Sequence, residues 1–131
     1  MNIVRASTVT PNEYPLRVEI RAHALGADLA ESDTAPNPHD YFDAALATCK
    51  ALTAQWYAKR HGIPLERVES EVERDDAKER AGVYHLRVKV TFHGPMTDEQ
   101  RALLYRAIGA CPVHKLMTTT EIEIETVAPG A

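Results

Sequence analysis

Hydrophobic and polar positions alternate most regularly near the start of the chain. Residues 15–23 place apolar side chains at every second position, with charged ones between: Leu16, Val18 and Ile20 alternate with Arg17, Glu19 and Arg21. A period of two is typical of a strand with one buried face. The same reasoning predicts further strands at 2–9, near 25–29, at 65–76, at 83–93 and at 122–126.

A period of three and four predicts one long helix over 38–61. Asn37 suits the N-cap, Pro38 the first helical position and Gly62 the C-terminal end. Its apolar residues form one stripe that we expect to be buried: Phe42, Ala45, Leu46, Cys49, Leu52, Thr53 and Trp56.

A second, shorter helix is predicted to begin after Thr97 and to stop near Gly109. Thr97 and Gln100 have the spacing of a capping box, in which each side chain bonds the backbone of the other residue. A helical turn through Val113 and Leu116 follows. Strands and helices in this order predict an α+β fold, and the length suits a single domain over residues 1–131.

Charge and hydropathy narrow the classes of function. The formal charge is -4, and no long basic stretch is present, so we expect no binding to nucleic acid. No apolar run approaches the ~20 residues that span a bilayer, and the N-terminus lacks the apolar core of a secretory signal. We therefore expect a cytoplasmic protein that does not associate with membranes.

The chain has only two cysteines, Cys49 within the long helix and Cys111 in the turn CPVHK. If the fold brings both sulfurs to one pocket, they can take up and return two electrons without a cofactor. Lasting structural disulfides are uncommon in the cytoplasm, which favours a working thiol pair. The alternative is that both are small packing residues, since free cysteine is among the most buried residue types.

Other chemistry has less support in the sequence. Cys111 and His114 have a spacing that can begin a zinc site, but a closed site takes four ligands and no second close-spaced pair is present. We therefore expect no metal and no cofactor. The histidines His23, His85 and His93 fall on strand faces with charged or polar neighbours, so we expect them to be solvated. No glycine-rich turn follows a strand as in a phosphate loop or a nucleophile elbow.

Three segments carry a resemblance to a known family. They are NPHDYFDAALATC, YAKRHGIPLERVESEV and FHGPMTDEQRALLYRAIGACPVHKLM. With them the chain resembles the OsmC/Ohr family, which comprises osmotically inducible protein C-like and organic hydroperoxide resistance proteins, over roughly residues 15–127. The resemblance implies an intertwined homodimer with antiparallel sheets wrapped around long central helices and two active sites at the subunit interface.

The resemblance also implies a thiol-dependent peroxidase. Cys49 would attack a hydroperoxide and become a sulfenic acid, Cys111 would condense with it to a disulfide, and an external dithiol would reduce that bond. An apolar pocket from Phe42, Leu46, Trp56 and partner residues would favour organic hydroperoxides.

The family's peroxidases place a glutamate in the first turn of the helix, where it orients an arginine toward the sulfur. Here that position is His39, followed by Asp40, and the candidate arginines are Arg17 and Arg21. This difference motivates an alternative hypothesis, a dimeric small-molecule-binding protein of the same fold with weak or no peroxidase activity. A third hypothesis is a metal site of histidine and cysteine.

Overall fold

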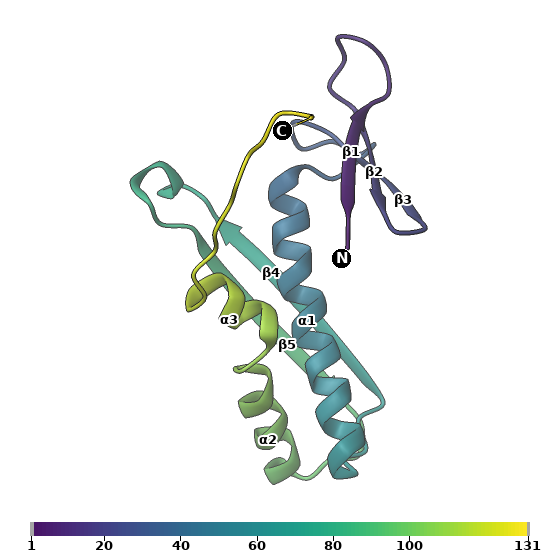
Figure 1. Ribbon diagram of the computed structural model, residues 1–131. Coiled ribbons are helices and arrows are strands. Elements are labelled where there is room, and N and C mark those ends of the chain that lie inside the picture. The colour runs from purple at the N-terminus through teal and green to yellow at the C-terminus, as the bar shows by residue number, and fades with distance from the viewer. Residues whose placement is uncertain (1, 131) are drawn as a thin grey trace. The chain divides into compact units, whose positions relative to one another are not determined.

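The computed structural model describes residues 2–130 and has an α+β fold with antiparallel sheets and one long helix, as predicted (Figure 1). The chain divides into two compact units. The first comprises the described residues up to Ala45 together with Glu73–Leu86, and the second comprises Leu46–Val72 and the residues from Arg87 onward. The expectation of one domain over 1–131 stays a prediction.

In the first unit, a three-stranded antiparallel sheet has the order β1-β2-β3. Its strands are β1 (Val4–Thr8), β2 (Leu16–Ile20) and β3 (His23–Ala27). The predicted strand over 15–23 was too long, because Arg21 adopts a φ of 52° and turns the chain. His23 therefore begins β3, where it is paired with Ile20, and does not share a strand with Arg17.

The long helix α1 (Pro38–His61) has the predicted bounds. The Asp40 amide donates to Asn37 Oδ1 at 2.8 Å, and the Asn37 amide donates to Asp40 Oδ2 at 2.9 Å. These two bonds satisfy backbone donors that a helix start leaves free. At the other end Gly62 has a φ of 64°, the left-handed conformation that commonly ends a helix.

The buried side of α1 differs from the predicted apolar stripe. Its buried residues lie four apart: Leu46, Lys50, Ala54 and Ala58. Four members of the predicted stripe are exposed: Ala45, Phe42 at 46%, Leu52 at 58% and Trp56 at 59%. The prediction was wrong here because α1 carries apolar residues on more than one side, and the chain covers only the row that contains Lys50.

A second sheet pairs β4 (Arg67–Asp75) with β5 (His85–His93), close to the predicted strands. A short 3-10 helix, η1 (Glu79–Ala81), lies in the connection between them. Beyond β5, Gly94 has a φ of 145°, and an added Cβ would lie 2.2 Å from the Pro64 carbonyl oxygen. Only glycine fits this close approach of two backbone segments.

Two further helices follow, α2 (Asp98–Ile108) and α3 (Pro112–Thr118). The predicted capping box of Thr97 and Gln100 is present. The core of the second unit joins α1, α2 and β5, and Figure 1 shows α2 beside the later turns of α1. Its buried residues are Ala54, Ala58, Ile63, Val90, Phe92, Leu104 and Ile108. Among the described residues, no helix is long and apolar enough to span a bilayer.

The strand predicted at 122–126 was wrong, because the described residues after Thr120 contain no strand. Ile122 and Ile124 alternate with glutamates as expected, yet Ile124 is 85% exposed. Alternation marks a segment that is able to join a sheet, but a strand also needs a neighbour to bond its backbone groups. The described strands of this chain do not supply that neighbour.

Candidate functional site

The second unit brings the two cysteines together. Cys49 is half-buried on α1, and Cys111 is fully buried directly before α3. Both thiols are free, and they lie near each other. The backbone amide of Val113 donates to Cys49 Sγ at 3.5 Å. Two reduced sulfurs that lie near each other are what a dithiol–disulfide cycle needs.

The turn between α2 and α3 positions Cys111. The Cys111 amide donates to the Ile108 carbonyl at the end of α2, and Pro112 occupies the first turn of α3. Proline favours a helix start and has no amide to leave unpaired there. Cys111 therefore lies at the break between two helical segments, as the CPVHK sequence predicted.

Lys50 is the residue of this site that the sequence analysis missed. Only 5% of it is exposed. Its Nζ donates to the Ile108 carbonyl at 2.7 Å and to His114 Nδ1 at 2.8 Å. Buried lysine is rare, so the residue type gave no reason to place it inside. The one indication in the sequence is its position four residues after Leu46 and four before Ala54.

The pKa of the Cys111 thiol is raised above its ordinary value, chiefly by burial. The His114 backbone amide and the Lys50 charge lower this pKa, whereas Cys49 raises it. Because its pKa is raised, Cys111 is a neutral thiol at neutral pH. Among residues 2–130, no cluster of three His, Cys, Asp or Glu side chains is arranged to hold a metal ion.

In the first unit, Asp40 binds an arginine that sequence reasoning did not select. Arg74 on β4 donates to Asp40 Oδ1 at 2.6 Å and to Asp43 Oδ2 at 2.9 Å, and Tyr84 donates to Asp43 Oδ1 at 2.7 Å. The pKa of Asp40 is lowered, first by the Asn37 amide and then by Arg74. Burial and the bond to Asp43 raise the pKa of Tyr84.

The two arginines proposed from the sequence have other surroundings. Arg17 forms an exposed pair with Glu19 at 3.0 Å on β2. Arg21 lies in the turn between β2 and β3. Arg17, Arg21 and Arg74 all belong to the first unit, whereas Cys49 and Cys111 belong to the second.

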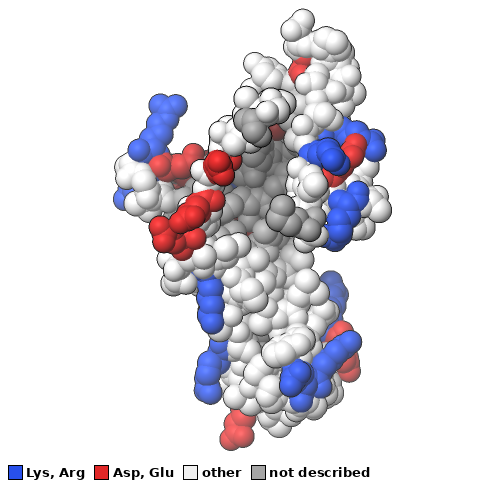
Figure 2. Space-filling view, in the orientation of Figure 1, with Lys and Arg blue, Asp and Glu red and all other residues white. Residues whose placement is uncertain are grey.

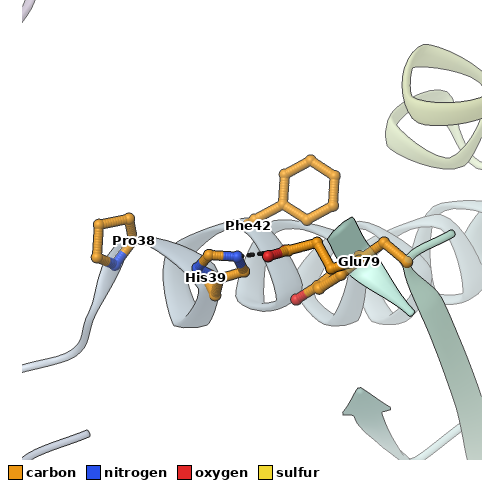
Figure 3. A pocket seen from close by; sticks show the side chains of 5 residues that line it. Pro38, His39, Phe42 and Glu79 are labelled. Atoms are coloured by element: carbon orange, nitrogen blue, oxygen red, sulfur yellow. Dashed lines mark hydrogen bonds and ion pairs between the residues drawn. The ribbon is translucent and has the colours of Figure 1, made fainter. Parts of the chain in front are cut away.

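His39 lines a cavity of about 320 Å³ in the first unit (Figure 3). Its Nε2 is 2.5 Å from a Glu79 carboxylate oxygen. The cavity is lined by Pro38, His39, Phe42, Glu79 and Tyr84. Of the three pocket residues predicted from the resemblance, Phe42 lines this cavity. Leu46 is buried elsewhere on α1, and Trp56 is exposed with the Arg60 guanidinium 5.1 Å from its ring.

Lysine and arginine side chains do not gather into one basic patch on the face drawn in Figure 2. Lysine and arginine are spread over several places, and acidic side chains group near the end of the β4–β5 hairpin. His85 and His93 are exposed as expected, and His93 lies 3.5 Å from Glu69.

Arg74→Met is expected to lower the free energy of unfolding by about 1–3 kcal/mol, because it leaves the largely buried Asp43 without its cation. The lowered pKa of Asp40 means that its ion pair contributes fully above the ordinary Asp value of 3.8 and is lost as pH falls through the lower folded value. The free energies of unfolding of the wild type and of Arg74→Met, measured with urea, should therefore differ less in acid than at neutral pH.

The matched control is Arg17→Met, which removes an exposed pair and is expected to cost less than about 0.5 kcal/mol. If both substitutions lower the free energy of unfolding equally, the ion pairs of Arg74 with Asp40 and Asp43 do not stabilise the first unit.

Comparison with known proteins places the chain in a structural context. A model of the OsmC-like protein family matches residues 31–127. The OsmC-like protein of Mycoplasma pneumoniae superposes with a TM-score of 0.74 at 17% identity, covering 91% of this chain and 88% of that one. No curated protein sequence matches.

Two further solved structures share the fold. The organic hydroperoxide resistance protein OsmC of Legionella pneumophila has a TM-score of 0.61 at 24% identity, with 91% of this chain and 90% of that chain covered. The organic hydroperoxide resistance protein OhrB of Bacillus subtilis has a TM-score of 0.56 at 18% identity, with 91% of each chain covered. At these identities the likeness establishes a common fold.

Proposed function

Because the chain belongs to the OsmC-like protein family, we propose that it is a thiol-dependent peroxidase that reduces organic hydroperoxides through Cys49 and Cys111. The observation that carries the proposal is the proximity of two reduced thiols, one from α1 and one from the turn before α3. The enzyme needs no cofactor, because the sulfurs themselves hold the two electrons. We place it in the cytoplasm, where dithiol reductants are available.

The reaction has three steps. The Cys49 thiolate attacks the terminal oxygen of the hydroperoxide, the O–O bond breaks, and the alkoxide leaves and takes up a proton to become an alcohol. Cys111, as a thiolate, then attacks the Cys49 sulfenic acid. A disulfide forms, and hydroxide leaves and is protonated to water. An external dithiol finally reduces the disulfide and is itself oxidised to a disulfide.

Apolar side chains on α1 support an organic substrate. Phe42, Leu52 and Trp56 expose much of their surface in the single chain. A hydroperoxide with an apolar tail gains free energy when such side chains and the tail leave water together, whereas hydrogen peroxide has no tail to bury. The names of the Legionella and Bacillus structures agree with this class of substrate.

We further propose that the protein acts as an intertwined homodimer. The single chain leaves large apolar side chains of α1 exposed, together with the alternating segment at 122–126. A second copy supplies two things that the single chain lacks: an apolar cover for α1 and a neighbouring strand for the segment at 122–126. The active sites would then include residues of both subunits.

The proposal is tested by counting free thiols after one equivalent of cumene hydroperoxide is added to the reduced protein. Both thiols of each chain should be lost in a fast reaction, and they should return with dithiothreitol. The same amount of hydrogen peroxide should react at least about tenfold more slowly, because only the organic substrate uses the apolar side chains. Thiols that survive the organic hydroperoxide unchanged would overturn the proposal.

One observation favours a second function, a dimeric binding protein with little peroxidase activity. His39 occupies the position where the family's peroxidases have a glutamate, and its ring is engaged with Glu79 at the cavity. A binding protein would keep sluggish thiols and take up an apolar ligand. Fluorescence of a bound apolar dye, displaced by added ligand, together with unreactive thiols would favour this function.

A further inference from the structure

Lys50 carries a buried positive charge that has no role in the three reaction steps described above. Its Nζ contacts two acceptors, the Ile108 carbonyl and His114 Nδ1. A protonated lysine only donates hydrogen bonds, so the carbonyl oxygen and the ring nitrogen both accept. Neither acceptor carries a negative charge. No carboxylate of the described residues forms an ion pair with Lys50.

This arrangement satisfies the hydrogen bonds of Lys50 without balancing its charge. A buried charge is costly unless an opposite charge lies nearby, and an apolar residue would fill the same row of α1 more cheaply. The Ile108 carbonyl that accepts from Lys50 Nζ also accepts from the Cys111 amide, so Lys50 and Cys111 meet at one oxygen. Cys49 directly precedes Lys50 on α1, so the groups near Lys50 that are able to become negative are the thiols of Cys111 and Cys49. The geometry of the site therefore points to a negative sulfur as the partner of Lys50.

We propose that Lys50 is a positioning residue for the resolving step, in which its ammonium stabilises the Cys111 thiolate that attacks the Cys49 sulfenic acid. This inference rests on the proposed peroxidase function. Cys111 is favoured over Cys49 as the sulfur that depends on Lys50 because it is fully buried. Water cannot solvate a thiolate there, whereas Cys49 is half-buried and also receives the Val113 amide.

The step balances without another reactant. Cys111 gives up its thiol proton, its sulfur forms a bond to the Cys49 sulfur, and the S–O bond of the sulfenic acid breaks. The hydroxide that leaves takes up a proton, so water is the product and the disulfide holds the oxidation. Lys50 keeps its proton throughout and contributes only its charge.

The first experiment follows both oxidation steps in Lys50→Met, which replaces the ammonium with an apolar side chain of similar length. The protein is mixed with cumene hydroperoxide, quenched with a sulfenic-acid trap such as dimedone, and analysed by mass spectrometry. The sulfenic acid should form at the wild-type rate, whereas the disulfide should form at least about tenfold more slowly. The trapped adduct should therefore accumulate, and the delay should shrink as pH is raised.

The matched control is Lys59→Met, which removes an exposed lysine from the same helix. It should form sulfenic acid and disulfide as the wild type does. If Lys50→Met forms the disulfide at the wild-type rate, the inference is overturned. Equal slowing of both steps would also overturn it, since that result indicates a general structural role.

A second experiment tests the charge without any peroxide. In the Cys49→Ser background, Cys111 is the only thiol, and its ionisation is followed by the ultraviolet absorbance of the thiolate. The charged group that acts on it is Lys50 from α1, whose Nζ contacts His114 Nδ1 from α3. Adding Lys50→Met should move the midpoint to higher pH by about one unit.

The two experiments separate the two proposals. If wild-type protein forms no sulfenic acid, the proposed peroxidase function fails, but the thiolate titration still reports on Lys50. An unchanged midpoint overturns the role of Lys50, whatever the peroxide reaction shows. If Lys50→Met does not fold, Lys50→Gln serves in the same titration, because its amide keeps a donor for Ile108 without the charge.

Discussion

Cys49→Ser is expected to abolish the reduction of organic hydroperoxides, with a loss in rate of more than about a thousandfold. A serine hydroxyl does not ionise near neutral pH and is a poor nucleophile unless a base activates it, whereas a thiol supplies a reactive thiolate. The measurement is the consumption of cumene hydroperoxide in the presence of excess dithiothreitol, corrected for the reaction of the dithiol alone.

Cys111→Ser is the matched control, because it removes the other thiol and leaves Cys49 in place. It should consume one hydroperoxide per chain quickly and accumulate a sulfenic acid that the trap detects. Turnover of Cys49→Ser at the wild-type rate would mean that the sulfurs do not carry the reaction. The binding function would then be the better account of the fold.

Trp56→Glu is expected to convert a homodimer into monomers, raising the dissociation constant by at least about a hundredfold. Trp56 is 59% exposed in the single chain, and large aromatic side chains are the commonest anchors of protein interfaces. A glutamate in the same place would remove the apolar contact area and bring a charge into the interface, which is costly. Sedimentation equilibrium at several protein concentrations measures the change.

Gln55→Glu adds the same charge one residue earlier, on a side of α1 turned by about 100°. It should leave the association much closer to that of the wild type. A wild-type protein that sediments as a monomer at all concentrations would contradict the proposed dimer, as would a Trp56→Glu protein that associates normally.

Features that depend on neighbouring residues were predictable from the sequence. The start of α1 rests on Asn37 and Asp40, three residues apart, and its end on Gly62. The start of α2 rests on Thr97 and Gln100 in the same way. Each cap is complete within one turn, so the local sequence contains all the groups that form it.

The charged residues inside the two units were not predictable, because their partners are distant in the chain. Lys50 contacts His114, which follows it by 64 residues, and Arg74 contacts Asp40, which precedes it by 34. Hydropathy assigns a lysine or an arginine to the surface unless such a partner is known. For the same reason the buried side of α1 was not predictable, because the charged residue Lys50 lies within its buried row.

The segment at 122–126 illustrates a different limit. Its apolar and acidic residues alternate, but a strand exists only with a neighbour. Sequence pattern describes what a segment is able to pair with and does not say which chain provides the partner.

The separation of Cys49 and Cys111 along the chain has a consequence for the heat resistance of the protein. A bond between them would tie two helices together and close a loop of about 60 residues. In the chain-entropy model, such a crosslink disfavours the unfolded state by roughly 4 kcal/mol. A cell exposed to oxidants would thus accumulate the disulfide form, which resists thermal unfolding better than the dithiol form. The melting temperature of the protein would therefore report the fraction that is still oxidised.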